Sequence, residues 1–296
     1  MIPVDLLTSR GQIMIAYNDE KWHCAHMTSA GPHLKARAYI GNLAAAGRYH
    51  FSGAEAREAL GVSAAAGNAA LHRLAKQGLI ASPARGFYLV VPPEYRSLGC
   101  LPAEQFIPTL MERQGRPYYA GLLTAAQYHG AAHQRPQAFQ VFTDRSRRDL
   151  SCGRVRVTFM RRRLLGAVPV ETRNTPRGVL RVSTPEATAI DLIGYQDQAG
   201  GLDHVAQVIF ELADRIRPEA LRAAAETAPI AWAQRLGFLL ERAETAAGGI
   251  ELADLKEYVL VHARESTPLL PGQPHEKSER NSDWRLWVNA RVEPEL

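Results

Sequence analysis

Two histidines in the sequence have the spacing of a metal site. His129 and His133 lie four residues apart in YHGAAH, the spacing at which two histidines on one helix face bind Zn²⁺. The glutamate of that motif is replaced by Gly-Ala-Ala and no third ligand is evident, so the pattern favours helix packing and capping. The segment WHCAH at 22–26 also offers adjacent ligands, but without a second cluster. The chain is therefore expected to bind no metal and no cofactor.

Two carboxylates, Glu186 and Asp191 in STPEATAIDL, have the residue types of a nuclease site. Such a site also needs a strand that carries Glu-x-Lys, and the sequence lacks one. A structural explanation is simpler, because Thr184 can cap a helix that begins with Pro185 and has an acidic residue in its first turn. A Gly-rich phosphate loop is missing as well, so an enzymatic function is not expected.

A polar face with the residue types that contact DNA is predicted on a helix at about Ala64 to Gln77. At 100° per residue, one side of this helix carries Gly67, Ala70, Leu71 and Leu74. The other side combines small residues, which permit close approach to bases, with donors to bases or phosphates. An ordinary helix with a solvated basic face would show the same pattern. The residues expected to face DNA, with Ser63 at the helix start, are Ser63, Ala65, Asn68, Ala69, His72, Arg73 and Lys76.

Two earlier helices and a hairpin would position this face. A first helix is predicted over His33 to Tyr49. Ser52 and Glu55 form a capping box at the start of a second helix, which ends at Gly61, and Ser63 caps the third. This order predicts a helix-turn-helix whose third helix enters the major groove.

The segment after the third helix predicts a β-hairpin. Gly78 ends the helix, and two short apolar strands, Leu79 to Ala81 and Phe87 to Val91, are joined by SPARG. A hairpin in this place is the wing of a winged helix, and it favours DNA binding over the solvated-face alternative. Arg85 at the hairpin tip is expected to reach a minor groove or a phosphate. Such wings also serve protein contacts.

The charge of the chain is divided unevenly. Residues 28–100 carry eight Lys/Arg and three Asp/Glu, and residues 101–182 carry fourteen and five, whereas residues 183–296 carry eleven and nineteen. The first two thirds are therefore expected to face a polyanion. In the middle third, Arg154 and Arg156 alternate with Val155 and Val157, which predicts a basic sheet face. This face could be exposed to solvent alone, extend the DNA contact along phosphates, or bind RNA or an acidic partner. With the neighbouring arginines, the predicted basic face comprises Arg145, Arg147, Arg148, Arg154, Arg156, Arg161, Arg162 and Arg163.

The bulk properties indicate an ordinary soluble protein with two domains. Its length of 296 residues allows this, and no run of about 20 apolar residues or leader-like N-terminus is present, so a cytoplasmic location is expected. The three cysteines, Cys24, Cys100 and Cys152, are widely separated without a CxxC pair and are expected to be packing residues.

The predicted fold class is α+β. An extension at 1–30 precedes the winged helix-turn-helix at 31–95, and the proline-rich stretch from Pro92 to Pro102 is expected to be a linker. A second domain at 102–296 has strands grouped before a bundle-like helical region. Helices are predicted at 103–114, 119–131, 186–195, 202–213, 219–226, 231–243 and 252–263, and strands at 138–143, 154–160, 168–173 and 179–182.

Five segments in one order resemble the AbiEi antitoxins of type IV, abortive-infection toxin–antitoxin systems. They are RGFYLVVPPEY (85–95), YYAGLLTAAQYHGAAHQRPQAFQV (118–141), STPEATAIDLI (183–193), QRLGFLLE (234–241) and DWRLWVNARVE (283–293). The resemblance covers roughly residues 34–293 and leaves the extension outside.

The resemblance implies a winged helix that represses its own operon by binding double-stranded DNA, at an inverted repeat as a dimer or as two adjacent monomers. It also implies a C-terminal domain that neutralises an AbiEii-like nucleotidyltransferase toxin without a stable complex. Two other hypotheses remain. One is a winged-helix transcriptional regulator whose C-terminal domain senses a small molecule, and the other is a nucleic-acid-processing enzyme carried to DNA by the winged helix.

Overall fold

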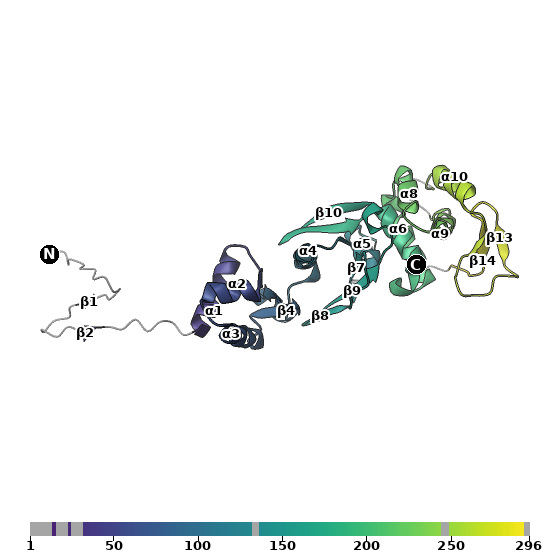
Figure 1. The fold of residues 1–296 in the computed structure, drawn as a ribbon. Helices are drawn as coiled ribbons and strands as arrows, with labels where there is room; N and C mark the ends of the chain where they lie inside the picture. The colour runs from purple at the N-terminus through teal and green to yellow at the C-terminus, as the bar shows by residue number, and fades with distance from the viewer. Residues whose placement is uncertain (1–13, 16–22, 25–31, 132–135, 244–248, 293–296) are drawn as a thin grey trace.

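The computed structural model describes residues 14–15, 23–24, 32–131, 136–243 and 249–292. Of the predicted extension it describes only β1 (Met14–Ile15), which pairs with β2 (His23–Cys24), so the rest of that prediction and His133 lie outside the described residues. Figure 1 shows an elongated molecule. A winged-helix unit lies at one end, a mixed sheet in the middle, and helices with a small C-terminal sheet at the other end.

The N-terminal unit confirms the predicted winged helix. Three helices pack around a core that includes Phe51, Leu71 and Leu74, and a three-stranded antiparallel sheet completes the unit in the order β3-β5-β4. Strand β3 was not predicted, because three residues are too few to show an alternating pattern. The elements are α1 (Pro32–Ala45), β3 (His50–Ser52), α2 (Gly53–Leu60), α3 (Ala64–Lys76), β4 (Ile80–Ala84) and β5 (Phe87–Val90).

The wing is a tighter hairpin than predicted. Strand β4 continues to Ala84, which pairs with Phe87, so only Arg85 and Gly86 form the turn. Gly86 has a φ of +72°, which glycine adopts without steric cost. The predicted five-residue connection SPARG is therefore wrong. Pro83 fits within the strand because the register between β4 and β5 is irregular between residues 81 and 84.

The stretch predicted as a linker is packed into the core of the protein. Its first turn is a 3₁₀-helix, η1 (Pro93–Tyr95), and Cys100 and Leu101 are fully buried. Both belong to a cluster of buried side chains that also contains Phe87 and Leu89 of the wing and side chains from the strands of the central sheet. Prolines remove backbone donors, but they do not prevent apolar neighbours from being buried. The winged-helix unit and the part of the chain that follows Pro102, called the second unit below, thus share a hydrophobic core.

The centre of the molecule is a six-stranded mixed sheet with the order β10-β11-β6-β7-β9-β8. The four predicted strands are confirmed within two residues at their ends. Strand β6 lies where the start of a helix was predicted, because it pairs with β7 and β11, and Tyr118 and Tyr119 face opposite sides of the sheet. The strands are β6 (Tyr118–Ala120), β7 (Phe139–Thr143), β8 (Leu150–Cys152), β9 (Val155–Arg161), β10 (Val170–Thr175) and β11 (Gly178–Ser183).

Helices accompany this sheet and then form the predicted bundle-like region. The predicted helix at 103–114 is divided at Phe106 into a 3₁₀ turn and a short α-helix. Helices α6 to α9 pack on one another through the larger hydrophobic core. They are η2 (Ala103–Gln105), α4 (Ile107–Arg113), α5 (Leu122–Tyr128), α6 (Pro185–Gly194), α7 (Leu202–Leu212), α8 (Pro218–Ala225), α9 (Ile230–Leu240) and α10 (Ala253–His262).

A small C-terminal sheet, which was not predicted, docks on α9. Trp284 is fully buried, and a Cβ on Gly237 would lie 2.1 Å from its ring, so the helix and the tail require a glycine at that position. The indole nitrogen of Trp284 donates to a carboxylate oxygen of Glu241 at 3.1 Å. The sheet has the order β12-β14-β13 and consists of β12 (Thr267–Pro268), β13 (Glu279–Asn281) and β14 (Leu286–Val288).

Candidate nucleic-acid interface

Helix α3 has the two faces predicted from its periodicity. Gly67, Ala70, Leu71 and Leu74 are buried against the rest of the winged-helix unit. Side chains on the opposite face are exposed, which leaves their donors accessible to a double helix. Every residue predicted to face DNA is exposed: Ser63, Ala65, Asn68, Ala69, His72, Arg73, Lys76 and, on the wing, Arg85.

The start of α3 is fixed by local hydrogen bonds and a close helix crossing. The hydroxyl of Ser63 accepts from the backbone N–H of Ala66 at 3.3 Å, as predicted for an N-cap. A Cβ on Gly67 would lie 2.6 Å from Cγ of Arg57, so glycine lets α2 and α3 approach closely. Gly61, with a φ of +62°, ends α2 and begins the turn between the helices. The backbone orients the exposed face of α3 before any ligand is bound.

The predicted capping box holds α2. Glu55 accepts from the backbone N–H of Ser52 at 2.5 Å, and the hydroxyl of Ser52 accepts from the N–H of Glu55 at 3.1 Å. Arg48 pairs with the same carboxylate. Burial alone would raise the pKa of Glu55, but the hydrogen bonds from Ser52 and Arg48 lower it to about 2. Glu55 therefore stays ionised throughout the neutral and mildly acidic range.

The wing is held against the second unit while its tip stays exposed. Strand β4 contacts β8, and Phe87 is buried in the shared core under the guanidinium of Arg113, whose Cζ lies 5.5 Å from the ring centroid. Arg85 at the turn is exposed. An arginine on a fixed turn can contact a phosphate or a narrow minor groove with little loss of backbone freedom.

The arginines of the predicted basic face do not all lie on one surface. Arg156 is exposed and Val157 is buried, as the alternation predicted. Arg147 is half-buried instead, with Cζ 3.9 Å from the ring centroid of Phe159. Burial and the charge of Arg116 lower the pKa of Arg147. The exposed members of the predicted set are Arg145, Arg148, Arg154, Arg156, Arg161 and Arg163.

Arg162 does not belong to any exposed face, which corrects the prediction. Its side chain is buried, and Nε donates to Oδ1 of Asp191 at 2.8 Å. The guanidinium also donates to the backbone oxygen of Thr227 at 2.9 Å. The RRR pattern could not reveal this role, because the partner Asp191 lies 29 residues away on α6. The contacts of Arg162 therefore connect the end of β9 to helix α6.

The two carboxylates considered as nuclease residues are buried and paired. Asp191 is fully buried and also accepts from the hydroxyl of Tyr119 at 2.7 Å. Burial raises the pKa of Asp191, and the charge of Arg162 opposes this rise. Glu186 accepts from the backbone N–H of Arg217 at 2.9 Å. Thr184 caps α6, as predicted, and both carboxylates are held by partners inside the protein.

His129 also has a structural position. It caps the C-terminus of α5, which ends at Tyr128, and its Nε2 lies 2.8 Å from the backbone oxygen of Ser183. Burial lowers the pKa of His129, although this hydrogen bond and the nearby Glu171 oppose the shift. Its Nδ1 lies 3.6 Å from a carboxylate oxygen of Glu171.

Comparisons with known proteins agree with this arrangement. The family described as "Transcriptional regulator, AbiEi antitoxin" matches residues 40–91, and the AbiEi antitoxin C-terminal domain family matches residues 119–242. The crystal structure of the RV2827C protein from Mycobacterium tuberculosis has the same fold, with a TM-score of 0.61 at 16% identity over 86% of this chain and 90% of that one. None of the curated protein sequences compared matches the chain. Within the described residues, no helix has the length and apolar character needed to cross a bilayer.

Proposed function

Since the chain belongs to the AbiEi antitoxin family, we propose that it is the antitoxin of a type IV toxin–antitoxin system and a repressor of its own operon. Repression would occur through sequence-specific binding of the winged helix to double-stranded DNA. The C-terminal unit would oppose an AbiEii-like nucleotidyltransferase toxin without a stable complex. The antitoxin would have no enzymatic activity of its own.

The observation that carries the DNA-binding part is the exposed polar face of α3. Asn68 can bond to the edge of an adenine, and Arg73 and Lys76 can bond to guanine or to phosphates. Ala65 and Ala69 lie on the same exposed face, where small side chains permit the helix to enter a major groove. The capped and packed backbone presents this face without rearrangement. An operator that contains an inverted repeat would bind two copies of the protein, either as a dimer or as two adjacent monomers.

A charge-removal variant tests this interface. Arg73→Ala/Lys76→Ala in the full chain should weaken binding to DNA from upstream of its own gene by about tenfold or more, because each lost phosphate or base contact weakens the complex. If both side chains contact phosphates, the slope of log affinity against log salt should fall by about 2. Gel-shift titrations at several salt concentrations measure both quantities.

The matched control removes two exposed positive charges far from α3. Arg264→Ala/Lys277→Ala changes the net charge equally but lies in the C-terminal region. It should leave operator affinity nearly unchanged. Equal affinity of both double variants and the wild type for the operator would exclude α3 from the interface.

Co-expression with the product of the neighbouring gene tests the antitoxin part. If that gene encodes a nucleotidyltransferase toxin, the wild-type chain should restore growth. The Arg73→Ala/Lys76→Ala variant should restore growth equally while failing to repress the promoter, since the two functions are assigned to different units. Failure of the wild type to restore growth would favour a regulator without antitoxin function.

The exposed arginines of the middle third are a second candidate for DNA contact. Arg148 lies in the loop before β8 and Arg156 on β9, and β8 contacts the wing strand β4. An operator bound by α3 and the wing would therefore pass near this edge of the central sheet. Contacts there would add to the salt dependence without adding base specificity.

A further inference from the structure

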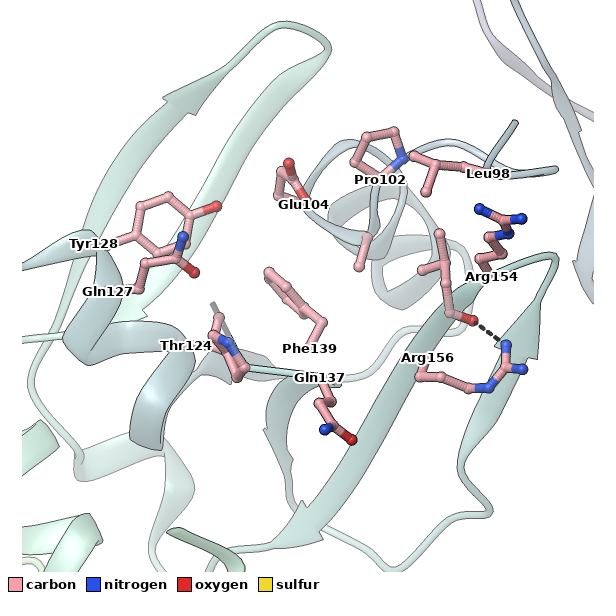
Figure 2. Close-up of a pocket in the computed structure, with 13 residues that line it drawn as sticks. Leu98, Pro102, Glu104, Thr124, Gln127, Tyr128, Gln137, Phe139, Arg154 and Arg156 are labelled. Atoms are coloured by element: carbon pink, nitrogen blue, oxygen red, sulfur yellow. Dashed lines mark hydrogen bonds between the residues drawn. The ribbon is translucent and has the colours of Figure 1, made fainter. Parts of the chain in front are cut away.

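A pocket of about 400 Å³ lies in the second unit, away from α3 (Figure 2). Its walls come from the junction segment at Leu98 to Glu104, the end of α5, and the start of β9. Figure 2 shows Phe139 between these walls. Pockets of this size accommodate a small organic ligand. The lining comes from segments far apart in the sequence, which is why no local motif indicated it.

The apolar part of the pocket is built around an aromatic ring. Phe139 is half-buried and packs on the shared core, and Leu98 and Val155 are half-buried on the junction side. Pro102 completes this part. A partly exposed ring beside flat aliphatic groups favours a planar ligand, because stacking covers the ring and excludes water.

The polar part combines positive charge with amides. Among the described residues, none bonds to the guanidinium of Arg154. Arg156 is held by the backbone oxygens of Gly153 and Val155, at 2.8 and 3.2 Å. Among the described lining residues, two arginines and one carboxylate, that of Glu104, leave a positive balance. An anionic group is therefore expected on the arginine side.

In the view of Figure 2, the amide of Gln127 lies across the ring from the arginines, and that of Gln137 lies below the ring. Figure 2 shows Gln127 at the end of α5 and Gln137 before β7, and both are exposed. A glutamine amide both donates and accepts, so it can match the hydrogen-bonding edge of a nucleobase. A simple fatty acid would not use the paired donor–acceptor groups.

We propose that this pocket binds a nucleoside phosphate, with the phosphate at Arg154, the base stacked on Phe139, and the base edge at Gln127 or Gln137. This site is separate from the exposed face of α3, although its Arg154 and Arg156 also belong to the basic face proposed as a second DNA contact, and it goes beyond the proposed antitoxin and repressor functions. The same chemistry is presented by a free nucleotide and by the phosphorylated end of a single strand.

Calorimetric titration of the full chain with the four ribonucleoside monophosphates and triphosphates tests the proposal. At least one should bind with a Kd below about 1 mM. Arg154→Gln removes the anchoring charge, and Phe139→Leu removes the ring but keeps apolar volume. Each should raise the Kd about tenfold, which corresponds to loss of one charge-assisted bond or one stacking contact.

Arg163→Gln is the matched control, because Arg163 is also exposed but follows the opposite end of β9 and does not line the pocket. It should leave the Kd unchanged, and melting temperatures should show that Arg154→Gln is folded. Inorganic phosphate and ribose 5-phosphate should bind at least tenfold more weakly than the nucleotide. Tighter binding of a 5′-phosphorylated trinucleotide would assign the site to a strand end, and weaker binding would assign it to a free nucleotide. Absence of nucleotide binding, or a Kd unchanged by Arg154→Gln, would overturn the proposal.

Discussion

The ion pair of Arg162 and Asp191 lies in the interior of the protein within a network of hydrogen bonds. Both side chains are buried, and the hydroxyl of Tyr119 and the backbone oxygen of Thr227 satisfy further hydrogen bonds. Removing one member of such a network leaves the other charge buried without a counterion, and this costs more than the pair itself contributes. The pair connects β9 to α6, two elements that the chain places far apart.

Asp191→Asn should therefore lower the free energy of unfolding by about 3 kcal/mol or more. Denaturant titration followed by circular dichroism measures the change. Asp197→Asn, at an exposed site on the following turn, should change it by less than about 0.5 kcal/mol. The double variant Arg162→Met/Asp191→Asn should recover part of the loss, since no charge stays buried. Equal stabilities for Asp191→Asn and Asp197→Asn would contradict this account.

His129 predicts a pH dependence of stability. Its pKa is lowered in the folded state, so below pH 6.5 the unfolded chain binds protons more readily than the folded chain. Stability from this group is fully present above pH 6.5 and is lost as the pH falls through the lower folded pKa. His50 adds to the same limb, because burial and the charges of Arg48 and Arg113 lower its pKa.

The fall in melting temperature between pH 7 and pH 5 should therefore be smaller in His129→Gln than in the wild type, but still present. Thermal unfolding in buffers across this range measures it, with His275→Gln as the control on a half-buried loop histidine. An identical pH profile for His129→Gln and the wild type would show that His129 does not titrate with folding.

At the residue scale, the sequence predicted the surface of α3 well because helical periodicity alone decides which side chains face outward. Asn68, Arg73 and Lys76 are exposed as expected. It failed for Arg162, whose burial depends on a partner on another element. The pocket around Phe139 could not be predicted for the same reason, since its lining comes from several segments.

A glycine on α9 determines how the C-terminal tail packs on this helix. Gly237 lies on α9 beneath the ring of Trp284, and a Cβ there would lie 2.1 Å from a ring carbon. Within the part of the chain that the structure describes, no atom of another element lies within 4 Å of a Cβ built on Gly41 of α1. The same substitution at these two helical glycines separates helix propensity from packing.

Gly237→Ala should lower the free energy of unfolding by about 1–3 kcal/mol, because the added methyl displaces the C-terminal sheet. Gly41→Ala should raise it by about 0.5–1 kcal/mol, since alanine favours the helix and nothing obstructs it. Thermal and denaturant unfolding measure both. Stabilisation by Gly237→Ala would show that Trp284 does not pack on α9 in this way.

At the element scale, the sequence predicted the helices and strands whose pattern lies within one segment. It did not predict those that depend on pairing between distant segments. The capping box of Ser52 and Glu55 and the N-cap at Ser63 predicted helix starts that the structure confirms. The short strands β3 and β8 have only three residues each, and their existence depends on pairing with distant strands. The same limit explains the small C-terminal sheet.

The molecule as a whole is more continuous than its proline-rich stretch suggested. Arg177, in the turn between β10 and β11, reaches both units: its Cζ lies 3.9 Å from the ring centroid of Tyr49 and 5.5 Å from that of Tyr95. It also pairs with Glu94 at 3.7 Å and donates to Gln105. Such a contact, together with the shared core, should restrict motion of the winged helix relative to the central sheet.

Arg177→Ala should therefore loosen the junction, and trypsin should cleave after Arg96 several times faster than in the wild type. Arg96 directly follows η1 and is exposed. Cleavage there requires local opening of the surrounding segment, which the contacts of Arg177 hold in place. Arg181→Ala removes an exposed arginine from the adjacent strand β11 and should leave the rate unchanged. Mass spectrometry of timed digests locates the cut. If the wild type were cut after Arg96 as rapidly as Arg177→Ala, the stretch would behave as an open linker, and the winged helix would move independently of the antitoxin unit.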